Sequence, residues 1–170
     1  MLFQRIVFFF LIFFLFGLYV QAQNKLFDDF FFKMPKKKAI LVIKENKKKF
    51  NNIKLGSNNS FILRKGSLAF EEDLLIHITM WSKNDLNPKT TEKKLHETVK
   101  YFVSKGFKIV HSQPEWSDPQ IKDLSKPYLR LVHKEQKLLV EIEPRGQGDL
   151  YNVFLSIYDL NWFSDKLNGL

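Results

Sequence analysis

Histidine is the residue type in this sequence best suited to metal binding or proton transfer, and it occurs as His77, His96, His111 and His133. No two of them stand two or four residues apart, the spacings that place two ligands on one face of a strand or helix. The chain has no cysteine, which excludes disulfide bonds, Cys-ligated zinc, iron–sulfur clusters and a thiol nucleophile. We therefore expect hydrogen-bonded, half-buried or strand-end histidines, no metal site and no cofactor.

Two carboxylates, Glu141 and Glu143, stand two residues apart in an alternating segment. On a strand they would share a face about 7 Å apart, a separation compatible with the paired carboxylates of glycoside hydrolysis. If residues 135–136 form a two-residue turn, however, Arg130 lies opposite Glu141, and we favour this surface charge ladder. The glycine-bearing segment 145–149 does not open a helix, as phosphate-binding loops do, so we interpret it as a plain connection between strands.

Signatures of the common enzyme classes are absent: the sequence holds no GxSxG, HExxH, Walker A, GxGxxG or EF-hand pattern. A small extracytoplasmic hydrolase with a dispersed site is still compatible with the sequence, and loops expected at 112–127 and 144–150 would form its walls. Trp81, Trp116 and Trp162 could form an aromatic contact surface for a glycan or a protein, although packing at the core or its rim is the usual role of tryptophan.

Positive charge is concentrated in one stretch of the chain. The net charge is +9, but residues 33–65 hold ten Lys and one Arg against a single acid, Glu45. Lysine triplets at 36–38 and 47–49 flank the apolar run 39–43, which we predict to be a strand. The triplets would then lie at opposite ends of that strand and form a broad basic stripe, our candidate binding site: Lys36, Lys37, Lys38, Lys47, Lys48 and Lys49.

A basic stripe suits a polyanionic partner such as anionic lipid head groups, an acidic glycan or an acidic protein. Of the 27 basic residues, 23 are Lys and four are Arg. Lys is a hydrated point charge and not the residue favoured for bidentate phosphate recognition, so we expect no tight phosphate pocket. We also expect no nucleic acid partner, since the chain is predicted to be exported. A lysine-rich solvated face without a partner is the alternative.

Residues 1–22 have the pattern of a secretory signal peptide. Arg5 precedes an uninterrupted apolar run over residues 6–20, and residues 20–22 form an acceptable cleavage site. Fifteen helical residues span about 22 Å, less than a hydrocarbon core of about 30 Å, so we favour cleavage over an uncleaved anchor. Both alternatives export residues 23–170 to the periplasm or the extracellular space. Membrane contact would be limited to the leader and to weak electrostatic attraction.

The order of elements predicts an α+β protein in which an arm or linker at residues 23–38 precedes a single domain at 39–170. Before the main helix, strands are expected at 39–43, 50–55, 61–63 and 74–81. The helix itself is predicted at about 88–105, with Asn87 as its N-cap and Gly106 as its C-terminal stop. Its core stripe would be Leu95, Val99, Phe102 and Val103.

After the helix, strands are expected at residues 107–111, 128–133, 138–143 and 151–160. The turn at 135–136 places Leu129, Leu131 and His133 opposite Ile142, Val140 and Leu138. No strand–helix–strand unit repeats, which argues against a doubly wound parallel sheet. We therefore predict an antiparallel β-sheet with one main α-helix packed on one face, following a signal peptide.

These features favour a small exported protein that acts by binding, without catalysis, on a protein or an anionic envelope surface. The alternatives are the dispersed-site hydrolase and a periplasmic carrier of an apolar ligand. A deep pocket with convergent polar groups would favour the hydrolase, and a large dry cavity would favour the carrier. A closed core with a flat basic face would favour the binding protein.

The leader makes a direct prediction about processing. We expect the exported protein to begin at Gln23, because residues 20–22 offer a small residue before the bond and follow the apolar run. Intact-mass measurement of protein from the native host checks this. A mature pool that retains residues 1–22 would show that the leader is an anchor and not a cleaved signal.

Overall fold

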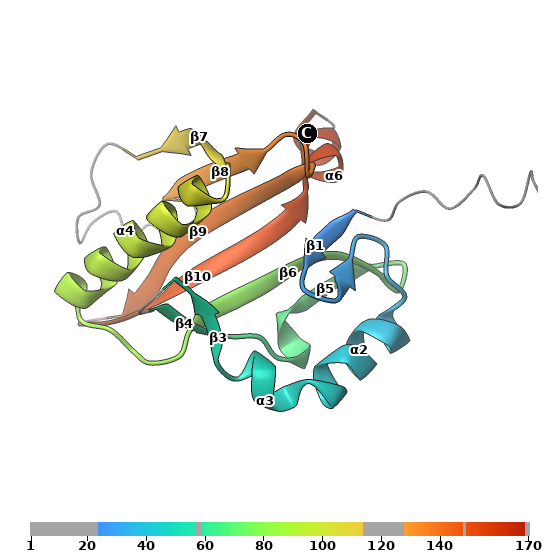
Figure 1. Ribbon diagram of the computed structural model, residues 1–170, viewed down its shortest axis with the longest axis horizontal. Helices are drawn as coiled ribbons and strands as arrows, with labels where there is room; N and C mark the ends of the chain where they lie inside the picture. Colours follow the sequence, from blue (N-terminus) through green and yellow to red (C-terminus); the bar gives the residue numbers. More distant parts are fainter. Residues whose placement is uncertain (1–23, 57–58, 114–127, 148, 169–170) are drawn as a thin grey trace, which may run out of the picture.

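The computed structural model describes residues 24–56, 59–113, 128–147 and 149–168. Its centre is an eight-stranded antiparallel sheet in the order β3-β4-β6-β10-β9-β8-β7, with β5 also paired to β6. One long helix, α4, crosses a face of this sheet (Figure 1). The chain therefore has the α+β architecture, antiparallel sheet and main helix that the sequence predicts.

The strands of the large sheet are β3 (Ile53–Leu55), β4 (Asn59–Ile62), β5 (Leu68–Glu71), β6 (Leu74–Ser82), β7 (Lys108–Ser112), β8 (Leu129–His133), β9 (Leu138–Gln147) and β10 (Leu150–Asp159). A separate hairpin consists of β1 (Lys25–Phe27) and β2 (Phe30–Phe31). The helices are α2 (Lys36–Glu45), α3 (Lys47–Phe50), α4 (Pro88–Ser104) and α6 (Leu160–Asn168), with a 3-10 turn η1 (Lys65–Ser67).

Strands β8 and β9 pair in the register that the alternation predicts. Leu131 lies opposite Val140, and Arg130 lies opposite Glu141. The inward-facing residues of β10 are at most 2% exposed: Tyr151, Val153, Leu155 and Ile157. These strands form one side of the core because every second side chain of a strand lies on the same face of the sheet, and on these strands those side chains are apolar.

Residues 144–147 belong to β9 and are not the connection that the sequence analysis expected. Gly146 pairs with Tyr151 near the end of the β9–β10 hairpin. A Cβ at Gly146 would lie 2.3 Å from Tyr151 Cδ1 and 2.3 Å from the Leu150 carbonyl oxygen, closer than any real side chain allows. The glycine therefore makes room for the buried Tyr151 within the protein and does not serve the approach of a ligand.

Helix α4 begins and ends as predicted. The Asn87 side chain accepts a hydrogen bond from the backbone N–H of Thr90 at 2.9 Å, and Gly106 adopts a left-handed φ of +89°. The backbone N–H of Phe107 then bonds the carbonyl of Phe102 at 3.1 Å, closing the last turn.

The core face of α4 differs in part from the predicted stripe. Leu95 and Phe102 are buried, but Val103 is 48% exposed, and two threonines, Thr91 and Thr98, are buried in its place. Each threonine hydroxyl donates to the carbonyl four residues earlier in the chain, which satisfies it inside the core. A stripe drawn from apolar residues alone could not include them.

The prediction of a strand at residues 39–43 is wrong, because this segment lies in α2. Ala39 and Ile43 are buried and stand one helical turn apart, whereas Leu41 between them is exposed. An apolar run of five residues does not distinguish helix from strand. Two local features favour a helix here: the lysines on either side have high helix propensity, and Pro35 occupies the N-cap position.

The N-terminal residues that were read as an arm or linker pack into the domain. Leu26, Phe30 and Met34 are at most 2% exposed and belong to the same core as Leu155. The backbone N–H of Leu75 donates to the carbonyl of Met34 at 2.9 Å. Residues from Asn24 onward therefore contribute to the fold.

Phe102 should be one of the most important side chains for stability. It is 6% exposed and packs edge-on against Phe107 at a centroid distance of 5.1 Å. We expect Phe102→Ala to lower the free energy of unfolding by about 3–5 kcal/mol. The exposed neighbour Lys100→Ala is the control and should change it by less than about 0.5 kcal/mol. Similar shifts of the urea midpoint for both variants would show that this helix face is misassigned.

Candidate functional site

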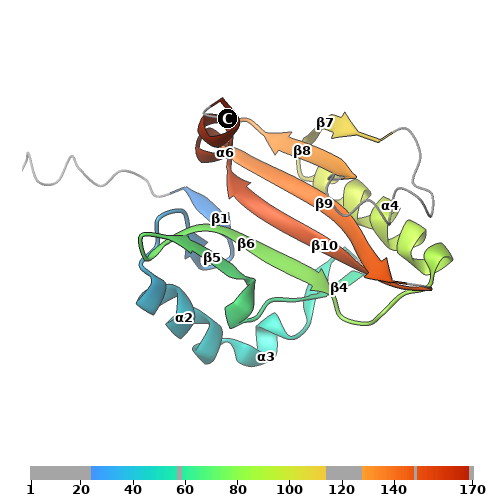
Figure 2. The ribbon, with the colours of Figure 1, turned by 180° about the vertical axis from the view of Figure 1, so that it is seen from behind.

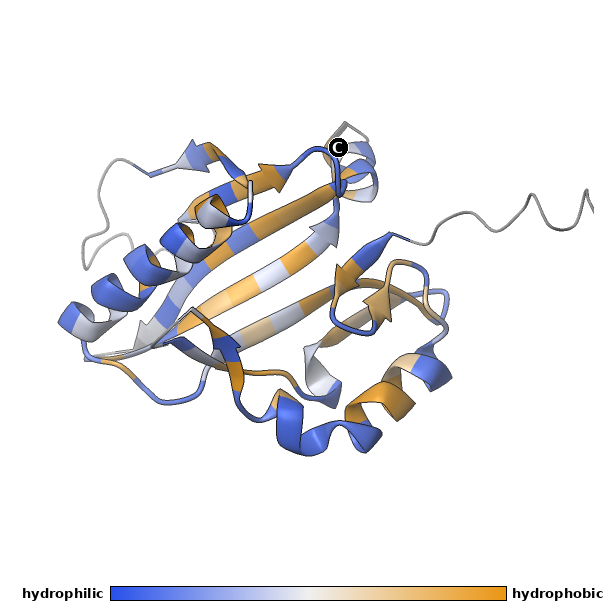
Figure 3. Cartoon of the chain, viewed as in Figure 1, coloured by the Kyte–Doolittle hydropathy of each residue, from blue (hydrophilic) through white to orange (hydrophobic). Residues whose placement is uncertain are grey.

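The six lysines predicted as a binding stripe lie on two consecutive helices. Residues 36–38 form the first turn of α2 and residues 47–49 form most of α3. Figure 3 shows hydrophilic residues at both places, with the apolar middle of α2 between them. Ten helical residues span about 15 Å, so the triplets lie at opposite ends of α2. The two lysine triplets are therefore separated along the surface, as expected, although the segment between them is a helix and not a strand.

Two of these lysines are bound to acids of the same chain. Lys36 donates to Asp73 at 2.7 Å, and Lys49 pairs with Asp28. The hydrogen bond that Lys49 donates to the Asp28 carboxylate raises the pKa of Lys49. Five other lysines of α2 and α3 are exposed and have no ion pair within the described parts of the chain: Lys37, Lys38, Lys44, Lys47 and Lys48. We call these five residues the lysine surface.

An exposed leucine accompanies the lysine surface. Leu41 is 51% exposed. Lys37 and Lys44 stand four residues before and three residues after it, so all three share the outward face of α2. An apolar side chain flanked by cations is the pattern of helices that lie in the interface of an anionic membrane.

The face of the sheet turned away from α4 carries aromatic and charged side chains. Seen from behind, β6, β10 and β9 present this face, and only its end near the C-terminus is close to α6 (Figure 2). We call it the outer sheet face. Its residues are His77, Thr79 and Trp81 of β6, Phe154, Ser156 and Tyr158 of β10, Glu141, Glu143 and Arg145 of β9, and Arg130 of β8.

Every arginine in the described part of the chain lies over an aromatic ring at or beside this face. Arg64 is 5.9 Å from the ring centre of Trp81, and Arg145 is 4.7 Å from that of Phe154. The two rings stack at 6.3 Å. Arg130 lies 5.2 Å from Phe163 of α6. Trp, Tyr and Arg are the residues enriched at the energetic centres of protein interfaces, so this composition is compatible with a protein partner.

The charges on the outer sheet face are largely satisfied within the protein. Arg130 donates to Glu141 at 2.7 Å, and the two side chains are 27% and 9% exposed. Arg145 donates to Glu143 at 2.8 Å. The carboxylates of Glu141 and Glu143 are therefore held by arginines, as in the predicted ladder, and are not arranged as a general acid and a nucleophile.

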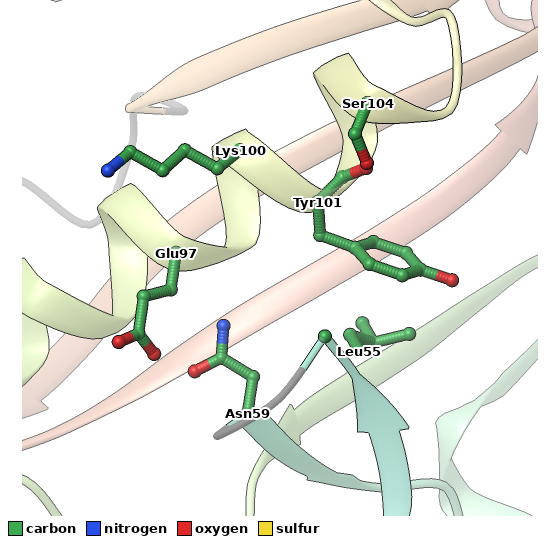
Figure 4. A pocket seen from close by; sticks show the side chains of 7 residues that line it. Leu55, Asn59, Glu97, Lys100, Tyr101 and Ser104 are labelled. Carbon is green, nitrogen blue, oxygen red and sulfur yellow. The ribbon is translucent and has the colours of Figure 1, made fainter.

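A hollow beside α4 is lined by several polar side chains (Figure 4). It has a volume of about 290 Å³ between α4 and the β3–β4 hairpin. Asn59, with its amide nitrogen toward Glu97, donates to Glu97 Oε2 at 3.0 Å and accepts from Thr98. The Ser104 hydroxyl donates to the carbonyl of Tyr101 at 2.7 Å. These groups bind α4 itself, and the hollow holds no nucleophile–base pair among its lining residues.

The histidines are spread over the protein. His77 lies on the outer sheet face, His96 is exposed on α4, and His111 is exposed on β7. His133 lies edge-on to Phe107 at 5.1 Å. Within the described residues no three His, Asp or Glu side chains gather in a way that could hold a metal ion. None of the helices in that same part of the chain is long and apolar enough to cross a membrane.

Trp81 and Trp162 both lie at the outer sheet face, and Trp116 lies outside the described residues, as does most of the loop expected at 112–127. Trp162 stacks on Tyr158 at 6.2 Å, and its Nε1 donates to Glu71 at 3.2 Å. The sequence places Arg130 opposite Glu141 but does not indicate that Arg64 and Arg145 lie over Trp81 and Phe154. The arginines come from three separate segments, and only the small number of arginines in the sequence distinguished them.

His77 should make stability depend on pH. Burial lowers its pKa below the ordinary 6.5, with Glu141 opposing the shift, and its buried Nδ1 has no hydrogen-bond partner among the described residues. Between the two pKa values, His77 is protonated in the unfolded chain but neutral in the folded chain. The free energy of unfolding therefore decreases as the pH drops below 6.5 toward the folded-state pKa. His77→Phe keeps the ring contact with Tyr158, at 4.6 Å in the wild type, and removes this loss.

Urea unfolding at about pH 5 and about pH 8 measures the effect. We expect the stability difference between the two pH values to be smaller in His77→Phe than in the wild type. An unchanged difference would mean that His77 is not held neutral by burial.

The chain was compared with known proteins at three levels. No protein-family model, no curated protein and no solved structure matches it. The function is therefore inferred from the lysine surface, the outer sheet face and the cavities of this structure.

Proposed function

We propose that this protein is a non-catalytic binding module, exported by its leader, that attaches to an anionic membrane surface through α2 and α3. The observation that carries the proposal is the lysine surface, five exposed cations without an ionic partner in the described residues. A single acid, Glu45, lies among them. Such a concentration of one charge sign attracts a surface of the opposite sign over distances of about one Debye length.

Leu41 favours a lipid surface over other polyanions. A leucine at the centre of a lysine-flanked helix face gains free energy by entering the boundary between head groups and acyl chains, but it gains little against an acidic glycan. Burial of a Leu side chain contributes about 1.5–3 kcal/mol. The combination of cations and one apolar side chain therefore provides two separable contributions to membrane binding.

The hydrolase alternative has little geometric support. The carboxylates of the outer sheet face are paired with arginines, and the hydroxyl and amide groups beside α4 bind the helix itself. The outer sheet face supports the wider idea of a binding protein, because its arginines and aromatic rings belong to β6, β8, β9 and β10 and not to α2 and α3, which would lie on the membrane.

The test is co-sedimentation of residues 23–170, which contain all the elements of the structure, with vesicles of phosphatidylcholine mixed with phosphatidylglycerol. We expect binding at about 0.1 M salt and its loss at about 1 M, where the Debye length falls to about 3 Å. Replacing the five lysines of the lysine surface with Gln should weaken binding by about a hundredfold or more, since each Lys near an anionic surface contributes about 1 kcal/mol.

The matched control replaces five other exposed lysines with Gln: Lys83, Lys89, Lys93, Lys108 and Lys134. Its net charge equals that of the first variant, and it should retain most of the binding. Leu41→Gln should weaken binding without changing its salt dependence. If both five-lysine variants lose the same amount of vesicle binding, binding depends on net charge alone and not on the lysine surface. If the wild type does not bind at low salt, the proposal is wrong.

A further inference from the structure

A second cavity system lies between the N-terminal hairpin and the end of α4, apart from the lysine surface. An inner hollow of about 210 Å³ is bounded by β1, β3, α4 and the sheet. An outer hollow of about 420 Å³ adjoins it beside β1. The two share Leu26, Phe27, Gln136 and Leu138 and are therefore adjacent, and we treat them together as one groove. We call it the β1–α4 groove, and Figure 1 shows the elements that form it.

The inner part of the groove is apolar. Phe102, Phe107 and Ile157 line it and are at most 7% exposed, so the groove reaches the hydrophobic core. Phe27 and Tyr101 are only partly buried and form its sides. Water in such a place finds few hydrogen-bond partners, whereas an apolar chain would make contacts along the walls. Together the hollows fall within the size range of ligand sites, about 300–1,000 Å³.

Positive charge lies at both hollows of the groove. Lys105 lines the inner hollow and Lys25 lines the outer one; both are exposed, and neither has an ion pair in the described residues. Asp28 also lines the outer hollow, but Lys49 pairs with it. Gln136 at the shared part adds hydrogen-bonding capacity. An apolar interior beside unpaired cations is complementary to an apolar chain with an anionic head group.

We propose that the β1–α4 groove binds a long-chain carboxylate, with its hydrocarbon tail against Phe102, Phe107 and Ile157 and its carboxylate at Lys105. A free fatty acid and the acyl chain of a membrane lipid share this chemistry, and the position of Lys105 beside the inner hollow favours the free acid. This binding is separate from membrane attachment, because the groove includes none of the lysine surface.

The experiment measures displacement of 11-(dansylamino)undecanoic acid from residues 23–170 by dodecanoate, by neutral dodecanol and by phosphatidylglycerol vesicles. In the wild type, we expect dodecanoate to displace the probe at lower concentration than dodecanol, and vesicles to displace it poorly. Lys105→Glu should weaken dodecanoate binding at least about fivefold and leave dodecanol unchanged, because only the carboxylate meets the reversed charge. Lys89→Glu, an exposed change at the other end of α4, is the matched control and should have no effect.

A second variant tests the groove as a space. Gln136 is exposed at the shared part of the two hollows, so Gln136→Trp should obstruct it and weaken both dodecanoate and dodecanol without unfolding the protein. The variant with five lysines replaced should bind the probe normally. Absence of displaceable binding in the wild type, or equal effects of Lys105→Glu and Lys89→Glu, would overturn the proposal. Vesicle binding could still hold in either case, so the two proposals fail separately.

Discussion

Strand β10 is hydrogen-bonded along both of its edges, to β9 from Leu150 to Asp159 and to β6 from Phe154 to Tyr158. This double pairing fixes which side chains of three neighbouring strands point inward. Because Val153 and Leu155 face the core, the residues paired with them on β9 and β6 must also face the core. The inward side chains form the surface that α4 and the N-terminal segment cover, and the outward ones form the outer sheet face. The two faces are thus decided by the same set of hydrogen bonds.

Arginine and the five unpaired lysines of the lysine surface occupy different surfaces of this protein, and their chemistry explains the separation. A guanidinium is flat and weakly hydrated, so it stacks on aromatic rings and forms oriented hydrogen bonds to carboxylates, as Arg130 and Arg145 do on the outer sheet face. An ammonium retains its water and extends into solvent, as at the five residues of the lysine surface, whereas Lys36 and Lys49 of the same helices pair with Asp73 and Asp28. A partner at the sheet would meet preoriented groups, whereas a partner at the helices would meet mobile charge.

Features governed by local pattern could be predicted from the sequence, including the β8–β9 register, the Asn87 cap and the exposed lysines. The identity of α2 could not, because five consecutive apolar residues fit a buried strand as well as a helix, and only the placement of Ala39 and Ile43 against the core separates them. The β1–α4 groove was also beyond prediction. Its walls come from segments that are distant in sequence, and one of them was expected to be a linker.

The N-terminal hairpin is attached to the opposite end of the chain. The Asn24 side chain donates to Asp159 at 2.7 Å and to the carbonyl of Lys137 at 2.9 Å, and Leu26 enters the core that β10 completes. A chain made from its N-terminus cannot close this contact until residue 159 has emerged, and contacts of such long sequence separation form slowly. Synthesis therefore ends before folding can. If the protein is exported as proposed, this delay keeps the segment that would enter a translocation channel first without its folding partner until the chain is complete.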